Sequence, residues 1–304
     1  MRDAMMEAMF ELAESNSDVM LLTADLGYGV FEKFAEKFPK QFLNVGVAEQ
    51  NMIGVASGLA LEGKIIFTYS IGNFPSLRCL EQIRNDACYH DLNITIIASG
   101  GGFSYGGLGM SHHATEDLSV MRALPAVTVV APCTAWETKQ AILQLAKQPG
   151  PGYLRIDKTK VDGVDQNGCY KIGKASVLRE GNDFTIIGAG GIAEEAMKAA
   201  EVLHESGIEC RVIAMHTVKP IDKEVIKAAC METNGIVTIE ENNLVGGMGA
   251  AVSEVCMDEQ IYPKNYLRLG INDIYMAEVG SQSYLRKRVG ITSDEIVRFI
   301  KSCQ

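Results

Sequence analysis

Residues 44–61 read NVGVAEQNMIGVASGLAL and place one acidic residue, Glu49, at the start of a run of small and apolar residues. The run predicts a helix that begins near Glu49 and is buried. A buried carboxylate without a partner is costly while it is charged, so its proton tends to stay on. Since a neutral Glu in an apolar cleft is a good proton donor, Glu49 is the leading candidate for a catalytic residue.

A structural interpretation of Glu49 is also open. An acidic side chain in the first turn of a helix complements the helix dipole and satisfies free backbone N–H groups. Glu49 alone does not decide between the two interpretations, so the decision depends on the rest of the chain.

Size and charge exclude several classes of protein. The 304 residues, 47% hydrophobic and 22% charged, predict a globular protein of two domains at the usual size of about 150 residues each. A net charge of -10 without a basic stripe argues against a nucleic-acid partner. No apolar run reaches the ~18 residues of a membrane span, and residues 1–14 indicate an amphipathic acidic helix rather than a secretory signal. We therefore expect a soluble, cytoplasmic protein without a membrane partner.

The eight cysteines include no C-x-x-C pair, and neither they nor the five histidines have the spacing of metal ligands. We expect reduced thiols and no metal held by this chain.

Short β-rich runs alternate with helical patterns, such as a helix expected over 75–90, along the whole chain. The polar segment 157–172 interrupts this pattern as a linker. The alternation is typical of parallel sheets covered by helices, so we predict an α/β fold with two parallel-sheet α/β domains, residues 1–160 and 173–304.

Two glycine motifs lack the features that would make them nucleotide sites. Residues 188–193 fit G-x-G-x-x-A, but the strand expected over 210–217 ends without the acidic residue that binds ribose. Residues 168–175, GCYKIGKA, carry Ala175 where a phosphate loop has Ser or Thr. We interpret the first as a tight strand-to-helix turn and the second as a chance match.

A glycine-rich loop, residues 100–109, precedes His112 and His113. We expect it to deliver these imidazoles to the carboxyl end of a strand, where open parallel sheets bind ligands. Tyr69 and Phe74 follow another strand at the same edge. Core packing is the default for an aromatic residue, but with Glu49 and His112 they would form a pocket suited to a flat heteroaromatic ligand.

Several segments together resemble the carboxyl-terminal half of a transketolase, a member of the thiamine diphosphate superfamily. The segments are GVAEQNMIG at 46–54, FTYSIGNF at 67–74, EDLSVMRALPAVTVVAP at 116–132, TVKPID at 217–222 and EENNLVGGMGAAVSEV at 240–255. The resemblance covers essentially the whole chain and implies a pyrimidine-binding domain followed by the transketolase carboxyl-terminal domain.

The family's Gly-Asp-Gly motif, which binds magnesium and the diphosphate, is missing from this sequence. The resemblance therefore implies the small subunit of a split transketolase, with thiamine diphosphate and Mg as cofactors and the Mg ligands on a second, diphosphate-binding subunit. It also implies a heterotetramer with two copies of each chain.

The resemblance assigns roles to residues of the glycine-rich loop and the Glu49 helix. Glu49, protonated, would bind the ring nitrogen of the coenzyme's aminopyrimidine and favour its imino form. His112 would bind or protonate substrate oxygens while a two-carbon ketol unit passes from a ketose to an aldehyde, and His113 is a second candidate for the same role.

Further coenzyme contacts are implied for the loops near the sheet edge. Phe74 and Tyr69 would pack against the pyrimidine, and Asp25 and Leu26 match an Ala-Asp-Leu segment near the coenzyme.

The substrate residues depart from the family pattern. A transketolase has His at the position of Gly100 and Glu-Asp-Gly at the positions of Gly107, Leu108 and Gly109. Loss of these polar groups predicts a changed, non-standard sugar substrate. Arg155 and Lys158 lie near the sequence position at which the family has a phosphate-binding Arg. An anionic substrate therefore stays among the candidates.

Other functions stay open on the sequence. The beta subunit of a 2-oxo acid dehydrogenase and a deoxyxylulose-phosphate synthase-like carboligase share this pair of domains. A binding or regulatory protein that kept the fold without the chemistry is the non-enzymatic alternative.

Overall fold

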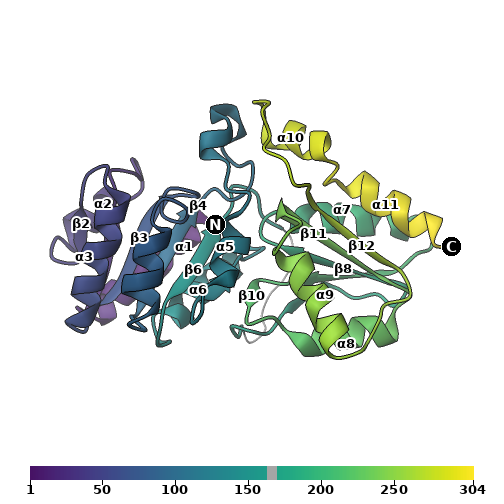
Figure 1. Ribbon diagram of the computed structural model, residues 1–304, viewed down its shortest axis with the longest axis horizontal. Helices are drawn as coiled ribbons and strands as arrows, with labels where there is room; N and C mark the ends of the chain where they lie inside the picture. The colour runs from purple at the N-terminus through teal and green to yellow at the C-terminus, as the bar shows by residue number, and fades with distance from the viewer. Residues whose placement is uncertain (163–169) are drawn as a thin grey trace.

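The computed structural model describes residues 1–162 and 170–304. The linker predicted over 157–172 therefore lies partly outside the described residues. Residues 168 and 169, the first two of the phosphate-loop-like segment 168–175, lie outside them as well. Two sheets, each with helices packed against it, lie side by side, and the carboxyl terminus lies at the far end of the second (Figure 1).

The first sheet has the strand order β10-β5-β6-β4-β3-β1-β2 among the described residues. Its strands are β1 Val19–Thr23, β2 Phe42–Asn44, β3 Ile65–Ile71, β4 Ile94–Ser99, β5 Thr128–Val130, β6 Gly152–Ile156 and β10 Thr217–Lys219. Its helices are α1 Arg2–Ser15, α2 Glu32–Lys37, α3 Glu49–Leu61, α4 Leu80–Gln82 with a π-helical turn over Ile83–Cys88, α5 Asp117–Ala123 and α6 Ala135–Leu145.

The second sheet has the order β12-β11-β8-β9-β7. Its strands are β7 Ser176–Arg179, β8 Phe184–Ala189, β9 Cys210–Ala214, β11 Ile236–Asn243 and β12 Tyr266–Ile271. Its helices are α7 Ala193–His204, α8 Lys223–Glu232, α9 Met248–Asp258, α10 Gln282–Val289 and α11 Ser293–Ser302. Most strand pairs in both sheets are parallel, which confirms the predicted α/β fold class.

The two domains are joined by more than one crossing of the chain. Strand β10 follows β9 of the second sheet but pairs antiparallel with β5 of the first. The sequence prediction missed this strand, and it also missed β7 and α10. The helix expected over 75–90 becomes regular only at Leu80, because residues before it form turns.

Strand β3 separates two layers of side chains, since successive residues of a strand point to opposite faces. Phe67 and Tyr69 belong to the hydrophobic cluster formed with α1, α2 and α6. Ile66 belongs to the cluster formed with Met52 and Ile53 of α3. Tyr69 and the helix that begins with Glu49 therefore lie on opposite faces of the first sheet.

Only one face of α3 is buried, which corrects the prediction of a fully buried helix. Met52, Ile53 and Ala56 pack into the core. Gly54 and Gly58 are exposed, and a Cβ added to either would meet no atom within 4 Å. Two of the small residues that made the helix look buried, Gly54 and Gly58, therefore lie on an open face.

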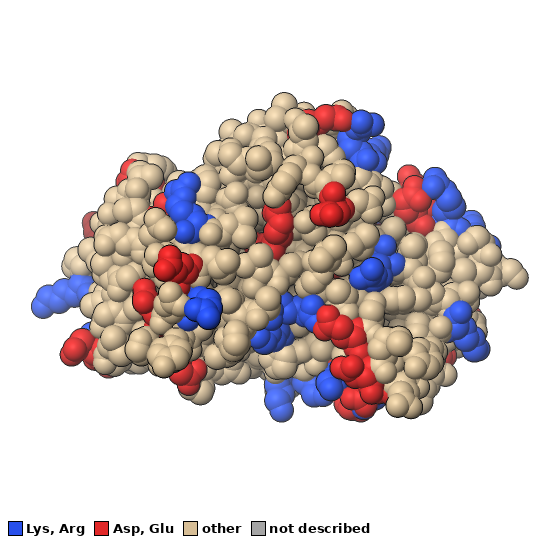
Figure 2. Space-filling view, viewed as in Figure 1, with Lys and Arg blue, Asp and Glu red and all other residues tan. Residues whose placement is uncertain are grey.

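On the face shown in Figure 2, acidic and basic side chains are interspersed rather than gathered into a stripe of one sign. Within residues 1–162 and 170–304, no helix has the length and apolar character that crossing a bilayer requires.

We predict that the free energy of unfolding falls as the pH drops from about 6.5 to about 4, because burial lowers the pKa of His216 to about 4. The unfolded state binds the proton first, so the stabilisation is complete above pH 6.5 and lost below it, by up to about 3 kcal/mol. His216→Phe, which keeps the stacking on Tyr170, should flatten this slope in urea titrations. The exposed control His90→Phe should leave it unchanged.

Candidate functional site

Glu49 is the first residue of α3 and is buried, with 2% of its surface exposed. Its Oε2 accepts a hydrogen bond of 2.6 Å from Nη1 of Arg78, whose side chain is 47% exposed. The premise that the Glu49 carboxylate has no partner is therefore wrong for this chain. Among the described residues no hydrogen bond reaches Oε1 of Glu49, so that oxygen is free to meet a ligand.

Phe74 connects Glu49 with the glycine-rich loop. The guanidinium carbon of Arg78 lies 4.5 Å from the centre of the Phe74 ring. The ring of His112 packs edge-on against the same ring, with 5.2 Å between the two centres. The structure thus brings Glu49, Phe74 and His112, three residues predicted from the sequence, into one chain of contacts through Arg78.

The two histidines of the loop lie in different environments. His112 is partly exposed, and its Nδ1 lies 3.0 Å from the hydroxyl of Ser111. His113 is buried against Phe103, and burial lowers its pKa. His112 can therefore reach a ligand from solvent, whereas His113 is a neutral interior side chain.

The glycine-rich loop is held in place by its close approach to other residues. Gly100 has a φ of +83°, and a Cβ there would overlap the ring of Tyr105. A Cβ on Gly101 would overlap Arg155, and one on Gly102 would overlap Glu241. Tyr105 thus fills the space beside Gly100, the position at which the resemblance implies a His in other family members.

Asp25 and Leu26 lie in the turn after β1, next to the start of the Glu49 segment. The backbone N–H of Asp25 donates to Oδ1 of Asn44, and Nδ2 of Asn44 donates to the Asp25 carboxylate. Oδ1 of Asn44 also accepts from the N–H of Gly46. Asn44 therefore ties the Asp25 turn to the turn that leads into α3. A cleft of about 180 Å³ lies beside it.

Tyr69 lies inside β3 and not in a loop after it, which corrects the sequence interpretation. Its ring packs edge-on against Phe31 at 4.8 Å between centres. Burial raises the pKa of its hydroxyl. Tyr69 is therefore part of the core on the face of the sheet opposite Glu49, and it does not join the contacts of Phe74.

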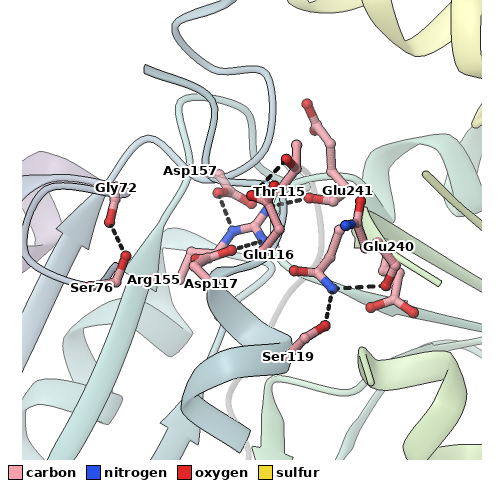
Figure 3. Close-up of polar contacts among 12 residues, drawn as sticks. Gly72, Ser76, Thr115, Glu116, Asp117, Ser119, Arg155, Asp157, Glu240 and Glu241 are labelled. Atoms are coloured by element: carbon pink, nitrogen blue, oxygen red, sulfur yellow. Dashed lines mark hydrogen bonds and ion pairs between the residues drawn. The ribbon is translucent and has the colours of Figure 1, made fainter. Parts of the chain in front are cut away.

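Arg155, predicted as a substrate residue, is 1% exposed and fully committed to protein groups. Figure 3 shows its guanidinium between Asp117, Asp157 and the backbone of Glu241. The three distances are 3.2 Å to Asp117, 3.1 Å to Asp157 and 3.0 Å to the carbonyl oxygen of Glu241. Burial disfavours the charged form of Arg155, but the nearby carboxylates of Asp157, Asp117 and Glu241 raise the pKa of its guanidinium. The prediction that Arg155 binds substrate is therefore wrong in this structure: the residue joins the two domains.

Glu241 extends this junction to the glycine-rich loop. Its Oε1 accepts from the N–H of Phe103 at 2.7 Å, and its Oε2 accepts from Nη2 of Arg286 in α10 at 2.7 Å. Asp157 in turn accepts from the N–H of Gly191 at the turn after β8. The loop with His112 is thus anchored from the second domain, and it stands beside α10 (Figure 1).

Lys158 is exposed, unlike Arg155. Its Nζ lies 3.8 Å from the centre of the Tyr105 ring. It lines a cavity of about 330 Å³ together with Arg2, Ser99 and Tyr105. Lys158 therefore remains available to an anionic group.

Sequence reasoning missed Arg78, Asn44 and Glu241. The signal for Arg78 was the burial of Glu49 itself, since a buried carboxylate needs a partner. Which of the 28 Lys and Arg residues supplies it is not a local property of the sequence.

Comparisons with known proteins agree with the resemblance seen in the sequence. Residues 1–163 match the family model of the transketolase pyrimidine binding domain, and residues 173–296 match that of the transketolase C-terminal domain. The chain belongs to the transketolase family.

Individual relatives indicate a split transketolase subunit. A transketolase C-terminal section of Methanocaldococcus jannaschii is 39% identical over 99% of this chain and 95% of its own length. The 6-deoxy-6-sulfo-D-fructose transketolase subunit SqwH of Clostridium sp. strain MSTE9 is 38% identical over 98% and 92%. A solved structure described as a split gene transketolase, inactive beta4 tetramer, has a TM-score of 0.88 at 36% identity and covers 99% of this chain and 97% of its own.

The transketolase family implies dependence on thiamine diphosphate. The described residues fit the aminopyrimidine end of this coenzyme, since Glu49 has an open Oε1 next to the Phe74 contacts. They do not provide a metal site, because no three His, Cys, Asp or Glu side chains in the described part of the chain are placed to hold an ion.

We predict that Arg155→Met destabilises this transketolase subunit by about 3–5 kcal/mol, because it leaves the carboxylates of Asp117 and Asp157 buried without their cation. Lys158→Met, at an exposed position, should change the stability by less than about 0.5 kcal/mol. Urea unfolding of the two variants checks this. Equal stability of both variants would contradict the interdomain role of Arg155.

Proposed function

We propose that this chain is the pyrimidine-binding, small subunit of a thiamine diphosphate-dependent transketolase that moves a two-carbon ketol unit from a ketose to an aldehyde. The observation that supports this best is the buried Glu49, with one oxygen held and the other open, linked through Arg78 and Phe74 to His112. A glutamate that only caps its helix would bond to backbone N–H groups, whereas the recorded bond of Glu49 goes to Arg78.

The bound coenzyme supplies the nucleophilic carbon that carries the two-carbon unit. Glu49 would hold a proton at Oε1 for the ring nitrogen of the aminopyrimidine, and Phe74 would pack against that ring. His112, whose Nδ1 is engaged by Ser111, presents Nε2 to a substrate oxygen. Asp25 and Leu26 shape the neighbouring turn. His113 supports the loop from inside.

A second subunit completes the site in this proposal. It carries the diphosphate-binding residues and the Mg ligands, and two copies of each chain form a heterotetramer. The open face of α3, with Gly54 and Gly58, permits the close helix packing of such an interface. The relative described as a beta4 tetramer is also described as inactive, which fits a requirement for the partner. We place the complex in the cytoplasm.

The substrate is a non-standard sugar with an anionic group. Tyr105 fills the space of the usual His near Gly100, and Leu108 and Met110 are exposed on the loop. This surface offers fewer directed hydrogen bonds to a pentose phosphate. Lys158 supplies a cation for a phosphate or a sulfonate. The name of the SqwH relative gives it a sulfonated ketose as substrate, which supports this choice.

We predict that Glu49→Gln lowers kcat of the reconstituted complex by about 10²–10⁴-fold, because the proton donor at Oε1 is lost. Glu62→Gln, an exposed change at the end of the same helix, should leave kcat unchanged. Ketol transfer is measured with 6-deoxy-6-sulfofructose and with xylulose 5-phosphate as donors. A complex whose kcat is unaffected by Glu49→Gln refutes the mechanism.

We predict that the complex prefers the sulfonated donor over xylulose 5-phosphate, and that Lys158→Met raises KM for either anionic donor about tenfold. Turnover of xylulose 5-phosphate and ribose 5-phosphate at ordinary transketolase rates would refute the substrate assignment. Decarboxylation of pyruvate would favour a 2-oxo acid dehydrogenase or a deoxyxylulose-phosphate synthase-like carboligase. Tight binding of thiamine diphosphate by this chain alone would refute the split site.

A further inference from the structure

The Arg78 guanidinium is held by two contacts that meet at the candidate site. Its Nη1 donates to Oε2 of Glu49 at 2.6 Å, and its carbon lies 4.5 Å from the centre of the Phe74 ring. A guanidinium stacked on an aromatic ring loses less freedom when it binds a carboxylate. The contact with Phe74 therefore holds the Arg78 guanidinium in position to bind Glu49, although the Arg78 side chain is about half exposed.

The pairing leaves the two oxygens of Glu49 unequal. Oε2 is occupied by Arg78, whereas no hydrogen bond from the described residues reaches Oε1. A guanidinium has only donors, so the oxygen that it binds must accept, and a charged carboxylate satisfies it best. In the absence of coenzyme, Arg78 thus favours the anionic form of Glu49 and orients Oε1 toward the ligand.

The thiol of Cys79, a further titratable group near Glu49, does not compete with this pair. Cys79 is buried, and burial together with the charge of Glu49 raises the pKa of its thiol to about 12. The thiol stays neutral, so Arg78 is the cation that balances Glu49.

We propose that Arg78 is a positioning residue that sets both the orientation and the charge of Glu49 before the coenzyme binds. This inference rests on the proposed function. The proton that Glu49 shares with the ring nitrogen is then absent from the empty site, and it must be taken up from solvent when thiamine diphosphate binds. One proton is added at Oε1, and the carboxylate loses its charge as it forms the hydrogen bond.

The proposal is tested by calorimetric titration of the reconstituted complex with thiamine diphosphate and Mg²⁺ in buffers of different ionisation enthalpy, which gives the protons taken up on binding. The wild-type complex should take up about one proton per site more than the Glu49→Gln complex. The Arg78→Met complex should show no such excess, because its buried Glu49 keeps its proton beforehand. Arg78→Lys, which retains the charge, should restore it, and the exposed control Arg84→Met should match the wild type.

A second measurement needs no coenzyme. The infrared difference spectrum of Arg78→Met against the wild type should gain the C=O band of a protonated carboxylic acid, and the double variant with Glu49→Gln should lack it. Proton uptake by Arg78→Met equal to that of the wild type, or the absence of this band, overturns the role of Arg78. Equal uptake by Glu49→Gln and the wild type also overturns the role of Arg78, because Glu49 then holds its proton before the coenzyme binds. The proposed function of Glu49 is overturned separately, by a Glu49→Gln complex whose kcat is unchanged.

Discussion

The guanidinium of Arg155 is the contact on which the arrangement of the two domains depends. A cation that is 1% exposed is tolerated only if its donors are satisfied. Asp117 and Asp157 of the first domain provide carboxylates, and the carbonyl of Glu241 in the second domain provides the third acceptor. Because these acceptors come from both domains, a rotation of one domain against the other would leave the charge buried and unpaired.

The same contact also fixes the loop that carries His112. Gly101 has to be glycine because a Cβ there would overlap Arg155, and the side chain of Glu241 binds the N–H of Phe103 two residues later. The loop is therefore held from the domain junction rather than by its own sequence. Gly101 and Gly102 allow the loop to pack closely against the charged side chains of Arg155 and Glu241.

The parts of the structure that follow from local patterns were predicted well. The alternation of strands and helices predicted both parallel sheets, and the helix expected to begin near Glu49 does begin at that residue. Strand β10 was missed because it has only three residues and pairs with β5, a strand of the first domain that is far away in sequence. Tyr69 and Arg155 were misplaced for a related reason: which face of a strand a side chain occupies, and which charges surround it, depend on residues far away in sequence.

Glu49 and Arg155 show how the same electrostatic rule gives opposite roles. Both are buried charges with a partner, but Arg155 is surrounded by acceptors on three sides and has no freedom left for a ligand. Within the described part of the chain Glu49 has one hydrogen-bond partner, Arg78, whose half-exposed side chain packs on Phe74, the ring that also contacts His112. A buried charged side chain whose polar atoms are all bonded to protein groups stabilises the fold. A buried carboxylate with only one bonded oxygen can still bind a ligand through the other. The state of pairing, rather than burial alone, therefore separates Arg155, which joins the two domains, from Glu49, which we propose to act in the site.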